Sequence, residues 1–273
     1  MTDSYAASED AGIAAAGAEA GARVVRALYG RRLARVDKGG GDFATTADLE
    51  AERAILDVIR TARPHDAVLG EEGGQQGAAD AVRRWLVDPL CGTLNYAAGT
   101  LVVAVNVAMS GGNSGGAAPS GWVAAVADPF GEELFHTDGR SAWGRRDGAD
   151  TPLQPSSATR LVDVNLDPPF PNAPGFRGVD LLAHPDFARE FRPRVVSSTL
   201  AVAWVAAGRR AAYVTDGGDL TGSVHFAAGI ALCRAAGCVV TDLDGAPLGP
   251  GARGLVVAAD AETHGRLIAM IRG

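Results

Sequence analysis

Residues 85–96 read WLVDPLCGTLNY and carry the most specific pattern in the chain. The stretch begins with a short apolar run, which predicts a buried strand. Asp88 and Pro89 end this run, and because an Asp-Pro pair favours a turn, Asp88 is either a turn initiator or a functional carboxylate at a strand end. Gly92 and Thr93 follow and can open a helix, whose first backbone N–H groups are suited to binding a phosphate.

A pair of carboxylates lies upstream of this stretch. Glu71 and Glu72 stand between glycines directly after the apolar residues 67–69, which predict another strand. Hard oxygen ligands of this kind suit Mg²⁺, which binds through one or two carboxylates together with a substrate phosphate. A solvated acidic turn is the alternative interpretation of the same pair.

The predicted elements change in kind along the chain. Ala-rich residues 5–35 predict one helix, and residues 48–62 predict a second, with Leu49, Leu56 and Ile59 on one apolar stripe. Short apolar runs then predict a meander of strands, and helices and strands alternate in the last third of the chain. This order predicts an α/β (α+β) fold built in layers.

The least regular residues lie near the middle of the chain. Residues 144–160 are polar and rich in Pro and Gly, so we expect an N-terminal α+β subdomain at 1–145 and a C-terminal α/β subdomain at 146–273. The metal and phosphate motifs belong to the first of these. Residues 110–121, SGGNSGGAAPSG, predict a flexible hairpin connection.

Composition excludes several classes of protein. The chain has 273 residues, a formal net charge of −7 and an apolar fraction of 47%, which together predict a globular protein with a sizeable core. The acidic balance lacks the basic footprint of a nucleic-acid-binding protein. No apolar run reaches the roughly 20 residues that cross a bilayer. Three cysteines without CxxC spacing argue against a disulfide framework and favour a reducing, cytoplasmic setting, with Cys233 and Cys238 interpreted as packing residues.

Six segments, in order, resemble the inositol monophosphatase family, the Mg²⁺-dependent, lithium-sensitive phosphatases of sugar phosphates and nucleotides. The resemblance covers nearly the whole chain. The segments are Lys38 with DFATTADLEAERAI (42–55), GEEG (70–73), WLVDPLCGTLNY (85–96), WVAAVADPFGEELFHTDGRSAWGR (122–145), AVAWVAAGRRAAYV (201–214) and HFAAGIALCRAAGCVVTDLDG (225–245).

This resemblance implies a layered αβαβα sandwich, a homodimer and hydrolysis of a small phosphate monoester of a sugar, inositol or nucleotide. It also implies roles for particular residues. Asp48 and Thr93 hold and deprotonate the attacking water, and Gly92 and Thr93 offer backbone N–H groups to the phosphate. The first metal ion, Mg²⁺, is held by Glu71, Asp88 and the Leu90 carbonyl.

The chain departs from the family pattern at the second metal site. Cys91 and His225 stand where the family has aspartates, so the resemblance implies that both lie close to Asp88. An acidic substrate-binding residue of the family aligns with Thr215, although Asp216 is adjacent. Thiol and imidazole are softer ligands than carboxylates, and they favour Zn²⁺ or Mn²⁺ over Mg²⁺ at this position.

Three functional hypotheses follow from these substitutions. The first is a phosphatase with an altered second metal site. The second is a repurposed enzyme in which Cys91 is a nucleophile and His225 its base, because a thiol beside an imidazole can ionise. The third is a protein that binds a phosphorylated ligand without turnover. None of the three requires nucleic acid or a membrane as a partner.

Overall fold

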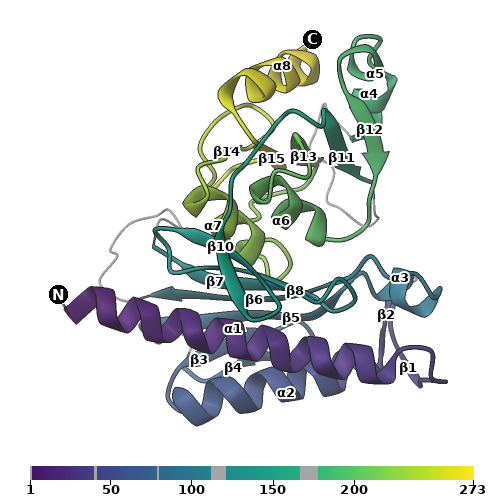
Figure 1. The fold of residues 1–273 in the computed structure, drawn as a ribbon. Coiled ribbons are helices and arrows are strands. Elements are labelled where there is room, and N and C mark those ends of the chain that lie inside the picture. The colour runs from purple at the N-terminus through teal and green to yellow at the C-terminus, as the bar shows by residue number, and fades with distance from the viewer. Residues whose placement is uncertain (1, 40–41, 79, 112–120, 167–177) are drawn as a thin grey trace.

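The structure is a computed structural model that describes residues 2–39, 42–78, 80–111, 121–166 and 178–273. It is built in five layers, with helices outside and between two sheets (Figure 1). Helices α1 (Thr2–Leu28) and α2 (Thr46–Ala62) cover the outer face of the larger sheet. Helices α6 (Leu200–Ala206) and α7 (Ala227–Ala235) lie between the sheets. The outer layer beyond the smaller sheet holds α4 (Gly178–Ala183), α5 (Phe187–Glu190) and α8 (Ala261–Arg272).

The larger sheet has eight strands in the order β10-β9-β8-β7-β6-β5-β3-β4. Only β3 and β5 pair in parallel among these neighbours. The strands are β3 (Ala67–Gly70), β4 (Gly74–Gln76), β5 (Arg83–Cys91), β6 (Ala104–Gly111), β7 (Val123–Asp128), β8 (Glu133–Thr137), β9 (Ala142–Arg146) and β10 (Ala149–Pro152).

The smaller sheet has five strands in the order β12-β11-β13-β15-β14. Strand β11 pairs in parallel with β12 and β13, and β15 pairs antiparallel with β13 and β14. A separate hairpin precedes α2, and a short helix, α3, follows β5. The bounds are β11 (Leu161–Asn165), β12 (Arg192–Val195), β13 (Ala212–Thr215), β14 (Val239–Thr241), β15 (Leu255–Ala258), β1 (Arg35–Gly39), β2 (Asp42–Thr45) and α3 (Thr93–Ala97). The predicted αβαβα sandwich is confirmed.

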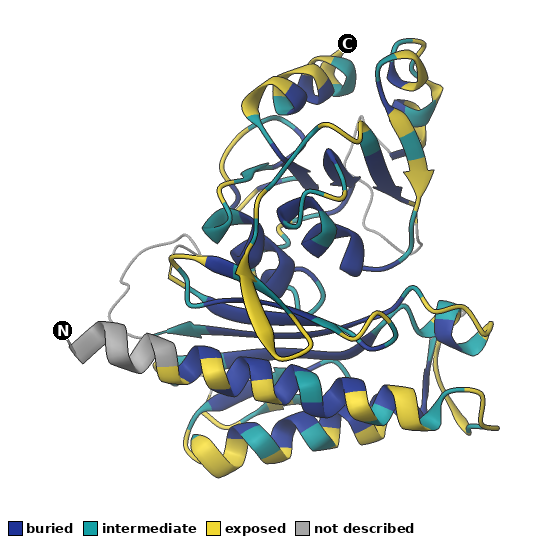
Figure 2. Cartoon of the chain, in the orientation of Figure 1, coloured by how far each residue is buried: buried dark blue, intermediate teal, exposed yellow. Residues whose placement is uncertain are grey.

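Alternate side chains of β5 pack into the two cores on either side of the larger sheet. Trp85 and Val87 point into the core beneath α1 and α2, whereas Leu86 points into the core around α6 and α7, because successive side chains of a strand face opposite ways. All three are buried, as is most of the sheet interior (Figure 2). Strand β5 therefore contributes to the cores on both sides of the larger sheet.

Two details of the predicted helices are wrong. The first helix ends at Leu28 rather than near residue 35, because Gly30 takes a left-handed conformation (φ 73°) and the chain turns into β1. Leu49 is 43% exposed instead of lying on the inner stripe of α2. The buried residues Leu56 and Ile59 are as predicted, and the stripe continues through Ile55, Ala51 and Ala47. Gly21 of α1 packs directly against Ile55.

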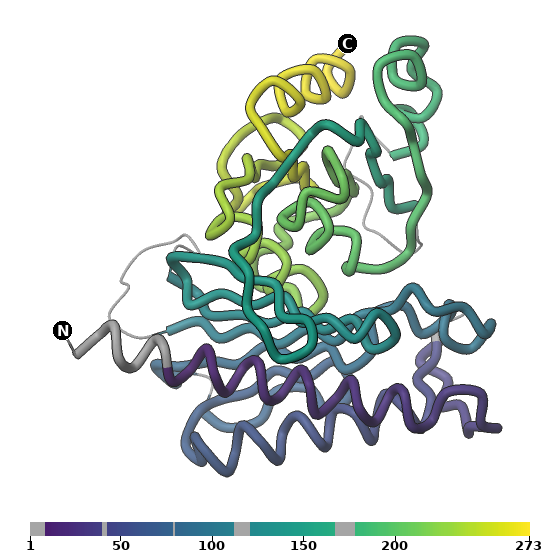
Figure 3. Tube along the Cα trace, in the orientation of Figure 1, coloured from purple at the N-terminus to yellow at the C-terminus, as the bar shows by residue number. Residues whose placement is uncertain are grey.

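The chain crosses from the larger sheet to the smaller one between β10 and β11, and α1 and α8 lie in the two layers farthest apart (Figure 3). The division into subdomains 1–145 and 146–273 stays a prediction. The central part of the predicted hairpin connection, 112–120, lies outside the described residues. No helix among the described residues is long and apolar enough to cross a membrane.

A partly buried carboxylate links the larger sheet to the segment between α6 and β13. Glu133 at the start of β8 accepts hydrogen bonds from Arg209, which lies between α6 and β13, at 2.6 Å, and pairs with Arg146 of β9 at 2.9 Å. Burial by itself would raise the pKa of Glu133, but the two guanidinium groups outweigh burial and lower it. The charged carboxylate is therefore favoured by folding.

We expect Glu133→Gln to lower the free energy of unfolding by about 1–2 kcal/mol at pH 7, discounted for solvent because the partner arginines are 42% and 60% exposed. A carboxylate with a lowered pKa stabilises the fold above its unfolded value, about 4.3. That contribution is lost as the pH falls through the folded value, so the two proteins should converge in acid. Urea unfolding at several pH values measures this, with Glu132→Gln as the control because Glu132 is 73% exposed and pairs with Arg26. Equal stability of wild type and Glu133→Gln at pH 7 would contradict the prediction.

Candidate active site

The end of β5 leaves regular pairing at Asp88. The register with β6 shifts between Asp88 and Cys91, where Pro89 lacks a backbone N–H. Asp88 is fully buried, and its Oδ1 accepts a hydrogen bond from the Leu90 N–H at 3.0 Å. Gly92 then takes φ 107°, and a Cβ there would lie 3.1 Å from the Val102 carbonyl, so glycine is required. As predicted, a helix opens at the next residue.

Asp48 and Thr93 meet at this turn. Thr93 Oγ1 lies 2.8 Å from Asp48 Oδ1 and 3.2 Å from the Leu90 carbonyl oxygen. The other carboxylate oxygen of Asp48 accepts from the N–H and the hydroxyl of Thr45, which caps α2 in a capping box. Burial raises the pKa of Asp48, and the hydrogen bonds from Thr45 and Thr93 oppose the rise. Asp48 is thus a fully buried carboxylate held by hydrogen bonds on both oxygens.

Glu71 lies beside Asp88 at the end of the neighbouring strand. Its N–H donates to the Val87 carbonyl at 3.0 Å, which fixes it against β5. Lys38 donates to Glu71 Oε1 at 3.0 Å and to Glu72 at 2.7 Å. The second oxygen, Glu71 Oε2, is buried and has no hydrogen-bond partner among the described residues. Burial, and next the charge of Asp88, raise the pKa of Glu71 to about 8.

Glu52 shapes the loop that carries Glu71. Its carboxylate accepts from the N–H groups of Glu72 at 2.9 Å and Gly73 at 2.7 Å. A Cβ on Gly70 would lie 2.6 Å from Glu52 Oε2, so the loop closes over this side chain only with glycine there. The two glutamates therefore do not form a simple solvated turn.

Asp88, Cys91 and His225 form a cluster whose ligand atoms all lie within 4.8 Å of one another. His225 Nδ1 lies 2.7 Å from Asp88 Oδ2, and the Thr199 N–H donates to Cys91 Sγ at 3.3 Å. Burial, with Asp88, raises the pKa of the Cys91 thiol, while His225 and Thr199 oppose the rise. Burial alone would lower the pKa of His225, but Asp88 outweighs it and raises it well above its ordinary value. The three groups hold one another in a polar network.

Asn106 on β6 completes this network. Its Nδ2 donates to Thr199 Oγ1 at 2.9 Å and lies 3.4 Å from Asp88 Oδ2. Neither Asn106 nor Thr199 was predicted from the sequence as a site residue. The signal for Asn106 was present, because it is a single amide within the apolar run AVNVAM at 104–109. Thr199 carries no such signal, since its position follows from how the residues before α6 contact Cys91 at the end of β5.

The structure therefore brings most of the predicted site residues together. Glu71, Asp88, Leu90, Cys91, Thr93, Asp48 and His225 are linked by the contacts given above. Asp216, the predicted substrate-binding residue, contacts a different part of the chain. It is buried at the end of β13, and its Oδ2 accepts from the Gly178 N–H at 3.4 Å.

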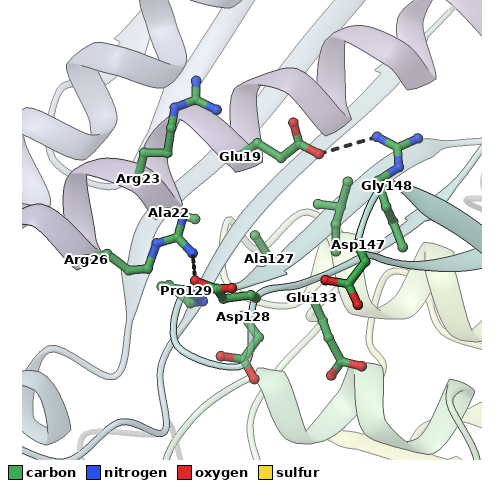
Figure 4. Close-up of a pocket in the computed structure, with 13 residues that line it drawn as sticks. Glu19, Ala22, Arg23, Arg26, Ala127, Asp128, Pro129, Glu133, Asp147 and Gly148 are labelled. Carbon is green, nitrogen blue, oxygen red and sulfur yellow. Dashed lines mark hydrogen bonds and ion pairs between the residues drawn. The ribbon is translucent and has the colours of Figure 1, made fainter.

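A separate cavity of about 280 Å³ lies on another face, between α1 and the turn from β7 to β8 (Figure 4). Its walls carry charged side chains, some of which pair with one another. Arg26 bonds Glu132 at 2.8 Å, and Arg145 bonds Glu19 at 3.3 Å. None of the site residues named above lines it, so it is not the candidate active site.

The chain is similar to known proteins both in sequence and in structure. A family model described as the inositol monophosphatase family matches residues 7–273. Inositol-1-monophosphatase of Mesorhizobium japonicum is 33% identical over 216 residues, which cover 76% of this chain and 75% of that protein. Nus factor SuhB of Escherichia coli K12 is 34% identical over 214 residues, covering 76% and 74%. The crystal structure of the extragenic suppressor protein suhB from Bartonella henselae superposes with a TM-score of 0.75, at 25% identity, covering 94% of this chain and 95% of that one.

Proposed function

Because the chain belongs to the inositol monophosphatase family, we propose that it hydrolyses a small phosphate monoester of a sugar, inositol or nucleotide with a divalent metal ion. The observation that carries this proposal is the meeting of three groups at the end of β5. These are the Glu71 carboxylate, the turn from Asp88 to Leu90, and the Thr93–Asp48 pair.

Glu71, Asp88 and the Leu90 carbonyl would hold the first metal ion, Mg²⁺. The unpartnered, buried Glu71 Oε2 supports this assignment, since a buried carboxylate oxygen without a partner is costly and a cation would satisfy it. All three ligands offer oxygen, as Mg²⁺ prefers. When bound, the ion polarises the phosphate and acidifies a nearby water.

Thr93 and Asp48 would activate the attacking water. The Thr93 hydroxyl donates to Asp48, which leaves its oxygen lone pairs free to accept a hydrogen bond from water. As the water oxygen bonds to phosphorus, its proton passes to Thr93 and the Thr93 proton passes to Asp48. The bond from phosphorus to the alcohol oxygen breaks, the leaving oxygen takes a proton from solvent water, and Asp48 returns its proton to solvent, so the products are the alcohol and inorganic phosphate. Gly92 and Thr93 would offer N–H groups to the phosphate, and Asp216 would bind the substrate.

Thr93→Val tests this relay. We expect kcat to fall about 10²-fold or more, because general base assistance contributes 10²–10⁴-fold, while KM changes little. Thr93→Ser keeps a hydroxyl and should retain most of the activity. Steady-state phosphate release at saturating metal measures both. Equal kcat for Thr93→Val and wild type would remove Thr93 and Asp48 from the mechanism.

Asp88, Cys91 and His225 would form an altered second metal site. One carboxylate, one thiolate and one imidazole suit Zn²⁺ better than Mg²⁺, and Mn²⁺ is the other candidate. Three protein ligands with an open fourth position are typical of catalytic zinc sites. The N–H of Thr199 supports the thiolate form of Cys91, because it donates to the sulfur.

The contact between Asp88 and His225 also favours a second candidate function. A carboxylate that holds Nδ1 of an imidazole beside a thiol is the arrangement of a cysteine nucleophile with its base. The raised pKa of Cys91 weighs against it, since the thiolate is the nucleophile. Activity that survives chelation and is lost on alkylation of Cys91 would establish this second function in place of the first.

We further propose a cytoplasmic homodimer whose partners are small phosphorylated molecules rather than nucleic acid or membrane. The net charge of −7 supports the exclusion of nucleic acid. Light scattering should give twice the chain mass of 27.9 kDa.

One relative is named a Nus factor rather than an enzyme, so binding without turnover stays the third candidate. It would appear as stabilisation by a phosphorylated ligand without phosphate release.

A further inference from the structure

Two cysteines, Cys233 and Cys238, lie close together where α7 ends. Cys233 lies in the last turn of α7 and is fully buried, and Cys238 follows the helix and is half-buried. The Cys238 N–H donates to the Cys233 carbonyl at 2.9 Å, and the Gly237 N–H donates to the Arg234 carbonyl at 3.1 Å. With Gly237 at φ 89°, these bonds define a Schellman motif. In that motif the side chains of the first and last residues, here Cys233 and Cys238, are frequently in contact.

We propose that Cys233 and Cys238 form a reversible disulfide when the protein meets a peroxide. A disulfide joins Cα atoms roughly 4.4–6.8 Å apart, and the backbone hydrogen bond between these two residues keeps them at close range. The site does not depend on the proposed phosphatase activity. It lies outside the cluster of Asp88, Cys91 and His225.

The chemistry assigns a different step to each thiol. Cys238, the more exposed of the two, releases its proton and attacks the peroxide as a thiolate. The O–O bond breaks, one oxygen stays on sulfur as a sulfenic acid, and the other leaves as hydroxide, which takes up the released proton to become water. The Cys233 sulfur then attacks the Cys238 sulfur, the S–S bond forms, and the hydroxyl leaves as water with the Cys233 proton. In total two thiols lose two electrons and two protons, and one hydrogen peroxide becomes two waters. Burial raises the pKa of Cys233 well above its ordinary value, which keeps its proton in place until the second step.

A disulfide between Cys233 and Cys238 would change the contacts of α6 as well as those of α7. The Cys233 thiol donates to the Val202 carbonyl at 3.2 Å, and a disulfide removes that donor. The two helices touch closely, since a Cβ on Gly229 would lie 2.8 Å from Val202 Cγ1. Thr199 directly precedes α6, and His225 lies two residues before α7. The disulfide therefore alters the packing of the two helices that carry these groups.

Trypsin offers a direct test in the unmodified protein. Cleavage after Arg234 separates Cys233 in peptide 211–234 from Cys238 in peptide 235–253, while Cys91 falls in peptide 85–140. After treatment with hydrogen peroxide and blocking of free thiols, we expect peptides 211–234 and 235–253 to be joined and to separate on reduction. Cys238→Ser should give no joined pair. Unjoined peptides, a link to peptide 85–140, or sulfinic acid at Cys238 in place of a link would overturn the proposal.

Hydrogen exchange tests the consequence for α6. We expect the amides of residues 199–206 to exchange faster in the peroxide-treated protein than in the reduced protein, and the difference to vanish in Cys238→Ser. A joined peptide pair with unchanged exchange in α6 would overturn the link to α6. Both readouts are independent of phosphate release, so they succeed or fail separately from the proposed function.

Discussion

Glu71→Gln is expected to lower phosphate release by roughly 10³-fold, because losing one charged metal ligand removes several kcal/mol of transition-state stabilisation. Glutamine keeps the size of the side chain, but a neutral amide cannot replace the charge of Glu71 Oε2, the buried oxygen without a partner among the described residues. The variant should also bind Mg²⁺ more weakly in calorimetry, in the absence of any substrate.

Glu72→Gln is the matched control for this experiment. The Glu72 carboxylate also accepts a hydrogen bond from Lys38, at 2.7 Å, but it is not one of the proposed metal ligands. The effect of Glu72→Gln on hydrolysis should stay within about tenfold, because Glu72 is one of two carboxylates that Lys38 bonds and holds none of the proposed metal ions. Wild-type phosphate release by Glu71→Gln in Mg²⁺ would contradict the assignment of the first metal site.

The double substitution Cys91→Asp/His225→Asp is expected to shift the metal preference for hydrolysis about 10²-fold from Zn²⁺ toward Mg²⁺. It replaces the thiol and the imidazole with carboxylates, whose oxygens suit the harder ion. Two added negative charges beside Asp88 repel one another without a cation. The apo variant should therefore be less stable than wild type, and Mg²⁺ should restore its melting temperature by mass action.

Cobalt provides a readout of the same site that does not depend on activity. Wild type loaded with Co²⁺ should show a thiolate-to-cobalt charge-transfer band in the near ultraviolet, and the double variant should lack it. Cys238→Ser is the matched control, since it removes a thiol away from the cluster and should keep the band. A band that persists in the double variant, or a metal preference that stays the same, would show that Cys91 and His225 are not ligands.

The sequence predicted the parts of the site that depend on local pattern. Asp88 and Glu71 follow apolar runs, so their place at strand ends could be predicted from the run lengths alone. Thr93 follows a glycine, and the short helix begins there as expected. The closeness of Cys91 and His225 came from the family resemblance, since 134 positions separate them in the chain. The five-layer fold came from the resemblance as well.

The rest of the site depends on contacts that no local pattern shows. Glu52 looks like an ordinary charged residue of an amphipathic helix, yet it is buried and shapes the Glu71 loop. The predicted first helix runs past Leu28, whereas the chain leaves the helix there, turns at Gly30 and forms β1 from Arg35. Leu49 was assigned to the core because it is apolar, whereas small alanines occupy the inner face of α2. The close packing of α2 against α1 determines which residues lie on the inner face, and the hydrophobicity of a single residue does not predict that packing.

Phosphate release by the unmodified protein tests the central claim most directly. A panel of sugar, inositol and nucleotide monophosphates would be incubated with Mg²⁺, Mn²⁺, Zn²⁺ or a chelator. We expect release from at least one ester with metal, none with the chelator, and the highest rate in a mixture that supplies Mg²⁺ together with Zn²⁺ or Mn²⁺. Release that continues at full rate in the chelator, or no release by the wild type beside rapid release by Cys91→Asp/His225→Asp, would contradict the claim that this chain is a metal-dependent phosphatase.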